Sequence, residues 1–315
     1  MVGATIGQAL RIDPARTATQ IETFVRAAVA RFDRQGVVLG LSGGLDSSVC
    51  AYLCRRALGA ERVLAYILPE RDSDPQNIRH AEQVARALGL SVTQIDLTPL
   101  LEQLGVYELA SREQAADRGL IEAGVRWIER LTGQPSAFSA GVSLLYAPAP
   151  GRLERLAHRI LRQPAGRIHA FIISKVRLRM VVLYHQALLH DCLVVGTTDK
   201  SEWSVGFYDK YGDGANDLAL LRHLYKTQIR ELARYLGVPA EIVAKPSSGD
   251  LAAGLPNEAV IGVSYEQLDG ALWALEQGWP DARIAAEAGI SAGALAAIRQ
   301  AMRIARSREA MPLHL

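Results

Sequence analysis

Residues 39–48 read LGLSGGLDSS, and this stretch decides the fold that we expect for the whole chain. An apolar run ends at Leu41, and Ser42 and two adjacent glycines follow. Asp46, Ser47 and Ser48 come next, and then a helical pattern begins. A strand, a glycine-rich turn and a helix N-terminus together make a site for an anion, because the backbone can approach a phosphate closely there. A carboxylate at Asp46 would repel a phosphate directly, so its presence predicts Mg²⁺ between the two groups.

The stretch differs from two other glycine-containing motifs. It lacks the lysine of the G-x-x-x-x-G-K-[ST] phosphate loop and the G-x-S-x-G pattern of a nucleophile elbow. It resembles the SGGxDSS pyrophosphate loop of the ATP pyrophosphatases, a superfamily that includes NAD synthetase, GMP synthetase, asparagine synthetase and tRNA-thiolating enzymes. The resemblance implies that the loop holds the β- and γ-phosphates of ATP, which leave together as pyrophosphate. An ordinary glycine- and serine-rich turn is the alternative.

Composition predicts an ordinary globular protein. The 315 residues suffice for one large domain with or without an appendage, and 49% are hydrophobic and 22% charged. The net charge is +2 and no apolar stretch approaches the roughly 20 residues of a membrane helix, so we expect neither nucleic acid nor a membrane as a partner. Without a secretory signal or a C-x-x-C pair among three cysteines, we expect a cytoplasmic protein with reduced thiols.

Strands and helices alternate along the chain. We expect strands at 37–41, 63–68, 92–95 and 192–196. We expect helices at 18–35, 48–58, 77–88, 171–189 and 225–236. This alternation predicts a doubly wound α/β fold with a mostly parallel, Rossmann-like sheet. Ligands of such sheets bind beyond the carboxyl ends of the strands, where the glycine-rich turn lies.

One long segment, at about 98–170, interrupts this alternation. We predict a helix at 107–130, then a stretch rich in Pro, Gly and Ser, then an arginine-faced amphipathic helix within 151–167. A surface excursion is the simplest interpretation, and a lid or partner-binding insert is the alternative. We therefore expect one domain over residues 1–265 that carries this helical insert, followed by a helical C-terminal hairpin segment over 266–315.

The loop after the 192–196 strand is dense in groups suited to phosphate and metal. These groups belong to Thr197, Glu202, Lys210, Asp213, Asp217 and Lys226. Asp46 and Glu202 could share one Mg²⁺, which typically takes one or two carboxylates plus phosphate oxygens. Lys226 begins a helix and could neutralise charge that develops on the phosphates. A hydrophilic loop with solvated charges is the alternative.

Lysine is rare in this arginine-rich chain, and its positions are clustered. The lysines are Lys175, Lys200, Lys210, Lys226 and Lys245. Arginine and lysine are not interchangeable, so these positions indicate sites that need a compact ammonium.

The motifs after the pyrophosphate loop resemble those of the ammonia-dependent NAD synthetase family. The similar segments are KVRLRM at 175–180, the residues around Glu202, GFYDKYGDGAND at 206–217 and LYKTQIRELARYLGVPAEIVAKPSSGDL at 224–251. The resemblance covers residues 20–96 and 171–275 and implies an adenine-nucleotide α-hydrolase-like domain. By position, it implies that ATP is bound by Gly40, Ser42, Gly43, Gly44, Asp46, Ser47, Ser48, Thr197, Lys226 and Ser247. It implies that deamido-NAD is bound by Arg177, Lys210, Asp217 and Arg308, and that Asp46 and Glu202 bind Mg²⁺ and act in catalysis with Lys226.

The resemblance also implies a reaction and an assembly. The carboxylate of deamido-NAD would attack the α-phosphate of ATP, and ammonia would then displace AMP from the acyl-adenylate. We find no catalytic triad and no glutaminase, so ammonia would be free or come from a separate glutaminase chain. The implied assembly is a homodimer.

Three features depart from the family pattern. Leu255, Pro256 and Asn257 replace polar groups, Ser307-Arg308-Glu309 stands where the family has His-Lys-Arg, and the 98–170 segment is longer than usual. A paralogue that amidates or ligates another carboxylate is therefore the alternative function. A DNA-binding regulator is a more remote one, because residues 281–305 resemble a helix-turn-helix. Its second helix is mostly alanine, with only Arg299 and Arg303 as basic residues.

Overall fold

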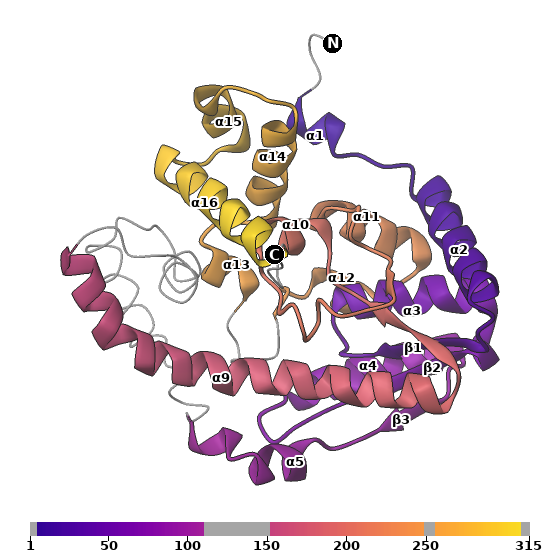
Figure 1. Cartoon of the computed structure of the whole chain (residues 1–315). Helices are drawn as coiled ribbons and strands as arrows, with labels where there is room; N and C mark the ends of the chain where they lie inside the picture. Colours follow the sequence, from indigo (N-terminus) through magenta and orange to yellow (C-terminus); the bar gives the residue numbers. More distant parts are fainter. Residues whose placement is uncertain (1–4, 110–151, 249–255, 310–315) are drawn as a thin grey trace.

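A five-stranded parallel sheet lies at the centre of the computed structural model, which describes residues 5–109, 152–248 and 256–309 (Figure 1). The strand order is β3-β2-β1-β4-β5. The strands are β1 (Gly36–Gly40), β2 (Val63–Ile67), β3 (Val92–Gln94), β4 (Cys192–Gly196) and β5 (Leu218–Ala219). The order reverses beside β1, which makes the carboxyl end of this strand the topological switch point. The predicted doubly wound α/β fold is confirmed.

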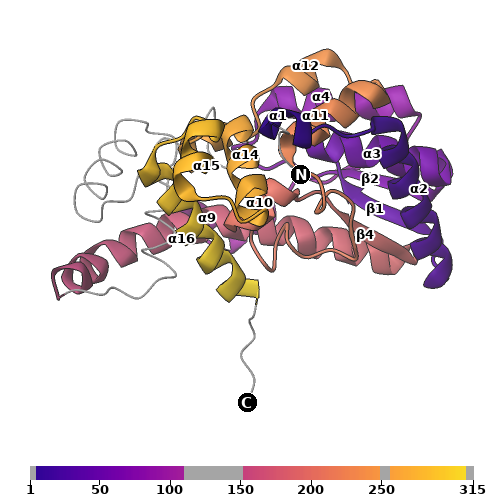
Figure 2. The same cartoon turned by 90° about the horizontal axis from the view of Figure 1, so that it is seen from above.

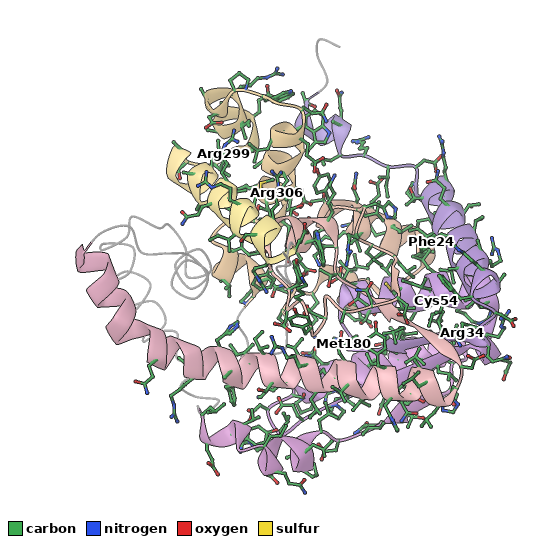
Figure 3. The ribbon with its side chains drawn as sticks, viewed as in Figure 1. Phe24, Arg34, Cys54, Met180, Arg299 and Arg306 are labelled. Atoms are coloured by element: carbon green, nitrogen blue, oxygen red, sulfur yellow. The ribbon has the colours of Figure 1, made fainter. Side chains whose placement is uncertain are left out.

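Helices cover both faces of the sheet (Figures 1 and 2). One face carries α2 (Pro14–Arg31), α3 (Leu45–Leu58), α4 (Pro75–Leu88), α11 (Lys226–Leu236) and α12 (Ala240–Ala244). The other carries α5 (Thr98–Gln103), the 3-10 turn η2 (Val106–Glu108) and α9 (Arg152–Leu189). Neighbouring side chains of β1 alternate, with Leu39 in the first core and Val38 in the second. Cys54 and Met180, labelled in Figure 3, belong to these opposite cores.

The C-terminal helices build a third core beside the sheet (Figure 1). This core joins α1 (Ile6–Ala9), α10 (Lys200–Val205), α13 (Asn257–Ile261), α14 (Tyr265–Glu276), α15 (Asp281–Ala288) and α16 (Ala292–Glu309). The hairpin predicted from 281–305 is α15 and α16, joined at Gly289, whose φ is +64°. Leu295 and Ile298 of α16 are buried in this core. Arg299 and Arg306, which are labelled in Figure 3, belong to the same helix but not to the core.

Two segments differ from the sequence-based predictions. The helix expected at 171–189 begins at Arg152, so the arginine-rich segment and the core helix form one 38-residue helix, α9. Pro164 and Gly166 indicate a break, but the cost of about 3 kcal/mol for one proline is small beside the hydrogen bonds of so long a helix. The long loop expected after β4 contains the short α10 and β5. Most of the helix expected at 107–130 lies outside the described residues.

None of the helices in the described ranges combines the length and the apolar character that a membrane span requires.

The boundary predicted at residue 265 lies at the first residue of α14.

The turn between β1 and α3 requires glycine at position 43. Gly43 has a φ of +72°, and a Cβ there would lie 2.1 Å from the backbone oxygen of Asn77 in α4. The glycine therefore lets the turn pack directly against the first turn of α4. We call Ser42, Gly43 and Gly44 the glycine loop.

Substitution of Gly43 by Ala should destabilise the fold beyond the backbone effect alone. Gly237→Ala is the matched control, because Gly237 has a φ of +79° with open space around a Cβ. We expect Gly237→Ala to cost about 1–2 kcal/mol from its backbone conformation. Gly43→Ala should cost a further 1–3 kcal/mol, roughly, from the contact with α4. Chemical denaturation measures both, and equal losses would show that the contact with Asn77 is unimportant.

Candidate active site

The loops that follow β1, β2 and β4 leave the sheet at the same edge. Gly40 at the end of β1 pairs with Tyr66 of β2, and Val38 pairs with Val194 of β4. Continuing that register places Gly40 beside Gly196 at the end of β4. The glycine loop therefore has the loops after β2 and β4 as its immediate neighbours.

The glycine loop presents the uncapped N-terminus of α3. Gly44 is the N-cap and offers no side chain to the first-turn N–H groups. The hydroxyls predicted to bind phosphate contact the loop itself: Ser42 Oγ lies 3.0 Å from Ser47 Oγ, and Ser48 Oγ donates to Gly44 O at 2.7 Å. The serines thus fix the shape of the loop, and the first-turn N–H groups are suited to an anion.

Lys226 lies at the centre of the site with its side chain fully buried. Its Nζ is 2.8 Å from Asp46 Oδ2, 2.8 Å from Asp199 Oδ2 and 3.0 Å from Glu202 Oε1. We call these four residues the Lys226 cluster. The structure therefore brings together Asp46, Glu202 and Lys226, which the sequence predicted as catalytic.

Asp199 is a member of the cluster that the sequence-based prediction missed. It is the N-cap of α10, where it accepts a hydrogen bond from the backbone of Glu202 at 2.7 Å. The pattern Asp199-x-x-Glu202 after a strand is a capping-box signal that could have placed both carboxylates at a helix N-terminus.

Two further residues orient Glu202, and the sequence predicted neither. The Tyr265 hydroxyl donates to Glu202 Oε1 at 3.2 Å. The Asn257 amide donates to the Tyr265 oxygen at 3.2 Å and lies 3.5 Å from Glu202 Oε1. Asn257 was one of the departures from the family pattern, and the structure shows it buried beside the predicted catalytic carboxylate.

The Lys226 cluster carries an excess of negative charge. Three carboxyl groups face one ammonium, so the acidic side chains outnumber the cation inside the cluster. Burial and then the charge of Asp199 raise the pKa of Glu202 to about 8. Burial raises the pKa of Asp199 to about 6, although Lys226 opposes the shift. Burial lowers the pKa of Lys226, but the three carboxylates outweigh it and hold that pKa well above its usual value.

This donor set fits a divalent cation. Asp46 Oδ1 is buried and has no hydrogen-bond partner within the described residues. A cation beside it would also balance the excess charge. The part of the chain that the structure describes contains no metal-binding group of three or more His, Cys, Asp or Glu residues. A cation here would therefore take one or two carboxylates and complete its shell with substrate oxygens and water, as Mg²⁺ does.

The residues predicted to bind deamido-NAD fall into two places. Arg177, Lys210 and Arg308 gather around the segment 206–213. Arg177 pairs with Asp209 through two hydrogen bonds of 2.9 and 3.0 Å. Lys210 Nζ donates to the backbone oxygen of Arg308 at 3.1 Å, and the guanidinium of Arg308 donates to two backbone oxygens of the segment at 2.9 Å. Asp217 lies elsewhere, beside the middle of β4, where its carboxylate accepts a hydrogen bond from the backbone N–H of Val194 at 2.8 Å.

The other predicted ATP-binding residues are Thr197, Ser247 and Gly40. Thr197 directly follows β4 and is half-buried. Ser247 follows α12, and its buried Oγ has no hydrogen-bond partner among the described residues. Gly40 ends β1 against Leu183 of α9, whose side chain would lie 3.3 Å from an added Cβ.

The native protein should lose stability as the pH rises from acidic to mildly alkaline values, and replacing Glu202 by Gln should remove this loss. Native Glu202 keeps its proton up to about pH 8, whereas an unfolded glutamate releases it near pH 4.3 (roughly). The native state therefore binds more protons between these values, and its stability falls as the pH rises through them. Glu202→Gln has no such proton to lose, so its melting temperature should decline less over this window.

Thermal unfolding without divalent cations checks this expectation. Glu266→Gln is the control, because Glu266 lies exposed in the first turn of α14. Equal pH profiles for Glu202→Gln and the control would contradict the expected proton uptake by Glu202.

The sequence is similar to known proteins over most of its length. Residues 17–129 and 171–312 match the family model described as NAD synthase. The NH(3)-dependent NAD(+) synthetase of Coprothermobacter proteolyticus is 37% identical over 264 residues, which cover 82% of this chain and 84% of that protein. Two solved structures match at 24% sequence identity, and they support the fold alone. NMN synthetase from Francisella tularensis has a TM-score of 0.66 over 97% of this chain and 98% of its own. The NH3-dependent NAD synthetase from Campylobacter jejuni has a TM-score of 0.63 over 97% of this chain and 100% of its own.

Proposed function

The chain belongs to the NAD synthase family, and from that membership we propose that it converts deamido-NAD to NAD with ATP and ammonia. Members of the family are ligases that form a carbon–nitrogen bond. The observation that carries the proposal is the convergence of Asp46, from the first turn of α3, and Glu202, from the first turn of α10, on the buried ammonium of Lys226. Both carboxylates thereby lie beside the uncapped N-terminus of α3.

The reaction divides into two steps. A carboxylate is a poor acyl donor, because its leaving group would be oxide. Attack of the deamido-NAD carboxylate oxygen on the α-phosphorus of ATP forms an acyl-adenylate and breaks the bond to pyrophosphate. Ammonia then attacks the carbonyl carbon, a proton is lost and AMP leaves with the bonding electrons of the acyl–oxygen bond. Holding both charged substrates in position supplies much of the acceleration.

The residues of the site have distinct roles in these steps. The first-turn N–H groups of α3 and the glycine loop would hold the β- and γ-phosphates. The ammonium of Lys226 would stabilise the negative charge on the departing pyrophosphate. Asp46 and Glu202 would hold Mg²⁺, which when bound supplies positive charge to phosphate oxygens. Arg177 and Lys210 would face the dinucleotide.

We also propose that the chain works as a cytoplasmic homodimer. Three large apolar side chains on the last turns of α9 support a second copy as partner: Val181 and Leu189 are each 63% exposed and Leu188 is 83% exposed. A nucleic acid is not proposed as a partner, because Leu295 and Ile298 of α16 are buried in the protein rather than presented to a groove. Ammonia would come from solution or from a separate glutaminase.

Asp46→Asn should lower the rate of pyrophosphate release by about 100-fold or more, because it removes a charge from the predicted cation site. Asp33→Asn is the matched control, because Asp33 is an exposed carboxylate in the turn before β1 and asparagine tolerates its φ of 51°. A coupled pyrophosphate assay measures both variants. Turnover of Asp46→Asn close to that of the control would refute the role of Asp46.

Incubation with ammonium, deamido-NAD and Mg-ATP should yield NAD, AMP and pyrophosphate in equal amounts. Chromatography identifies the products, and the appearance of ADP would refute the adenylation step. The assay runs beside a panel of other carboxylic acids, including the mononucleotide acid. AMP formation with another acid and none with deamido-NAD would favour the paralogue instead.

A further inference from the structure

A second buried lysine lies outside the Lys226 cluster. Lys175 belongs to α9, and its side chain is only 1% exposed. Its Nζ donates to Glu70 Oε1 at 3.1 Å and to Asp72 Oδ2 at 2.7 Å. Both carboxylates belong to the segment 68–74 that follows β2, which we call the β2 loop.

Aromatic side chains complete the surroundings of this ammonium. Lys175 Nζ lies 4.0 Å from the ring centre of Phe171 and 5.4 Å from that of Tyr107. The Tyr107 hydroxyl donates to Glu70 Oε2 at 2.7 Å, and Arg71 stacks on the Tyr107 ring at 3.7 Å. The oxygens of Glu70 therefore have partners on both sides, and the loop is held by several independent contacts.

The charges in this cluster balance. Lys175 and Arg71 carry one positive charge each, and Glu70 and Asp72 carry one negative charge each. In the Lys226 cluster, by contrast, three carboxyl groups face a single ammonium. A charge-balanced cluster calls for no ligand of its own, and its contacts hold the β2 loop in place.

The β2 loop connects Lys175 to the glycine loop. Ser73 Oγ accepts from the backbone N–H of Glu70 at 3.1 Å, and Asp74 caps α4 by accepting from the N–H of Gln76 at 2.8 Å. Asn77, in the first turn of α4, carries the backbone oxygen that a Cβ at Gly43 would meet at 2.1 Å. Gly40 pairs with Tyr66, so the glycine loop and the β2 loop also leave the sheet side by side.

We infer that Lys175 is a positioning residue for ATP: by fixing the β2 loop and the start of α4, it fixes the wall against which the glycine loop holds the triphosphate. This inference rests on the proposed function, because it assumes that ATP binds at the glycine loop. The residue itself stays out of contact with the nucleotide, since its ammonium is enclosed by two carboxylates and two rings. A lysine suits this place because its compact ammonium fits between carboxylates that a planar guanidinium would separate.

Two variants separate positioning from simple stability. Lys175→Met keeps the length of the side chain but leaves Glu70 and Asp72 without their shared cation. Lys175→Met/Glu70→Gln removes one charge of each sign, so the remaining Arg71 and Asp72 balance. The double variant should recover most of the melting temperature lost by the single one. Arg86→Met is the control, because Arg86 lies 71% exposed on α4 in a surface pair with Glu82.

Calorimetry with α,β-methylene-ATP and Mg²⁺ measures nucleotide binding in each folded variant. Both Lys175 variants should bind the analogue about ten-fold or more weakly than the unchanged protein, while the KM for deamido-NAD stays within about two-fold. The control should bind normally. Recovery of both melting temperature and analogue affinity in the double variant would overturn the inference, because the effect would then be one of stability alone.

Hydrogen exchange in the absence of nucleotide tests the same inference independently of the reaction. Amides of the β2 loop, the first turn of α4 and the glycine loop should exchange faster in Lys175→Met than in the control. Unchanged exchange in these segments would overturn the positioning role even if the protein binds ATP. Failure of the unchanged protein to bind the analogue would refute the proposed function, and the exchange rates would still report whether Lys175 fixes the loops.

Discussion

The fully buried ammonium of Lys226, in contact with three carboxylates, is the interaction on which the rest of the site depends. Asp46 comes from α3, Asp199 is the N-cap of α10, Glu202 lies in the first turn of α10, and Lys226 lies in the first turn of α11. The three helices follow different strands or loops, and the ion contacts set how their N-termini meet at the edge of the sheet. Buried charges are costly unless paired, so removal of the ammonium would leave the buried carboxylates without a cation.

The two buried lysines differ in how far the charges around them balance. Lys175 and Arg71 match Glu70 and Asp72, and every carboxylate there contacts a cation. Around Lys226 the carboxylates outnumber the ammonium, burial raises the pKa of Glu202 to about 8, and Asp46 Oδ1 has no partner within the described residues. Such an imbalance is costly in the free protein and is relieved by a cation, which is typical of sites that bind a charged ligand.

Local pattern predicted most of the fold but only part of the site. Four strands follow from apolar runs, whereas β5 was missed because Leu218–Ala219 is too short to show a period. Asp46, Glu202 and Lys226 stand in motifs with their own local chemistry, and the structure brings them together. Tyr265 reaches Glu202 from 63 residues away in the chain, so only the packing of α14 against α10 reveals their contact. The role of Lys175 was hidden likewise, since its partners lie about a hundred positions earlier.

The geometry of Lys226 limits how the site can meet its substrate. An ammonium has three N–H groups, and in the free protein it has three carboxylate neighbours within 3.0 Å. A phosphate in contact with Lys226 would therefore compete with these carboxylates for the ammonium. A carboxylate that lost the ammonium would need another cation, because an unpaired buried charge is costly. The excess of carboxylates would thus link two events. A cation held by Asp46 and Glu202, as proposed, would offset the charge that Lys226 otherwise balances, and the ammonium would then be free to contact the departing pyrophosphate.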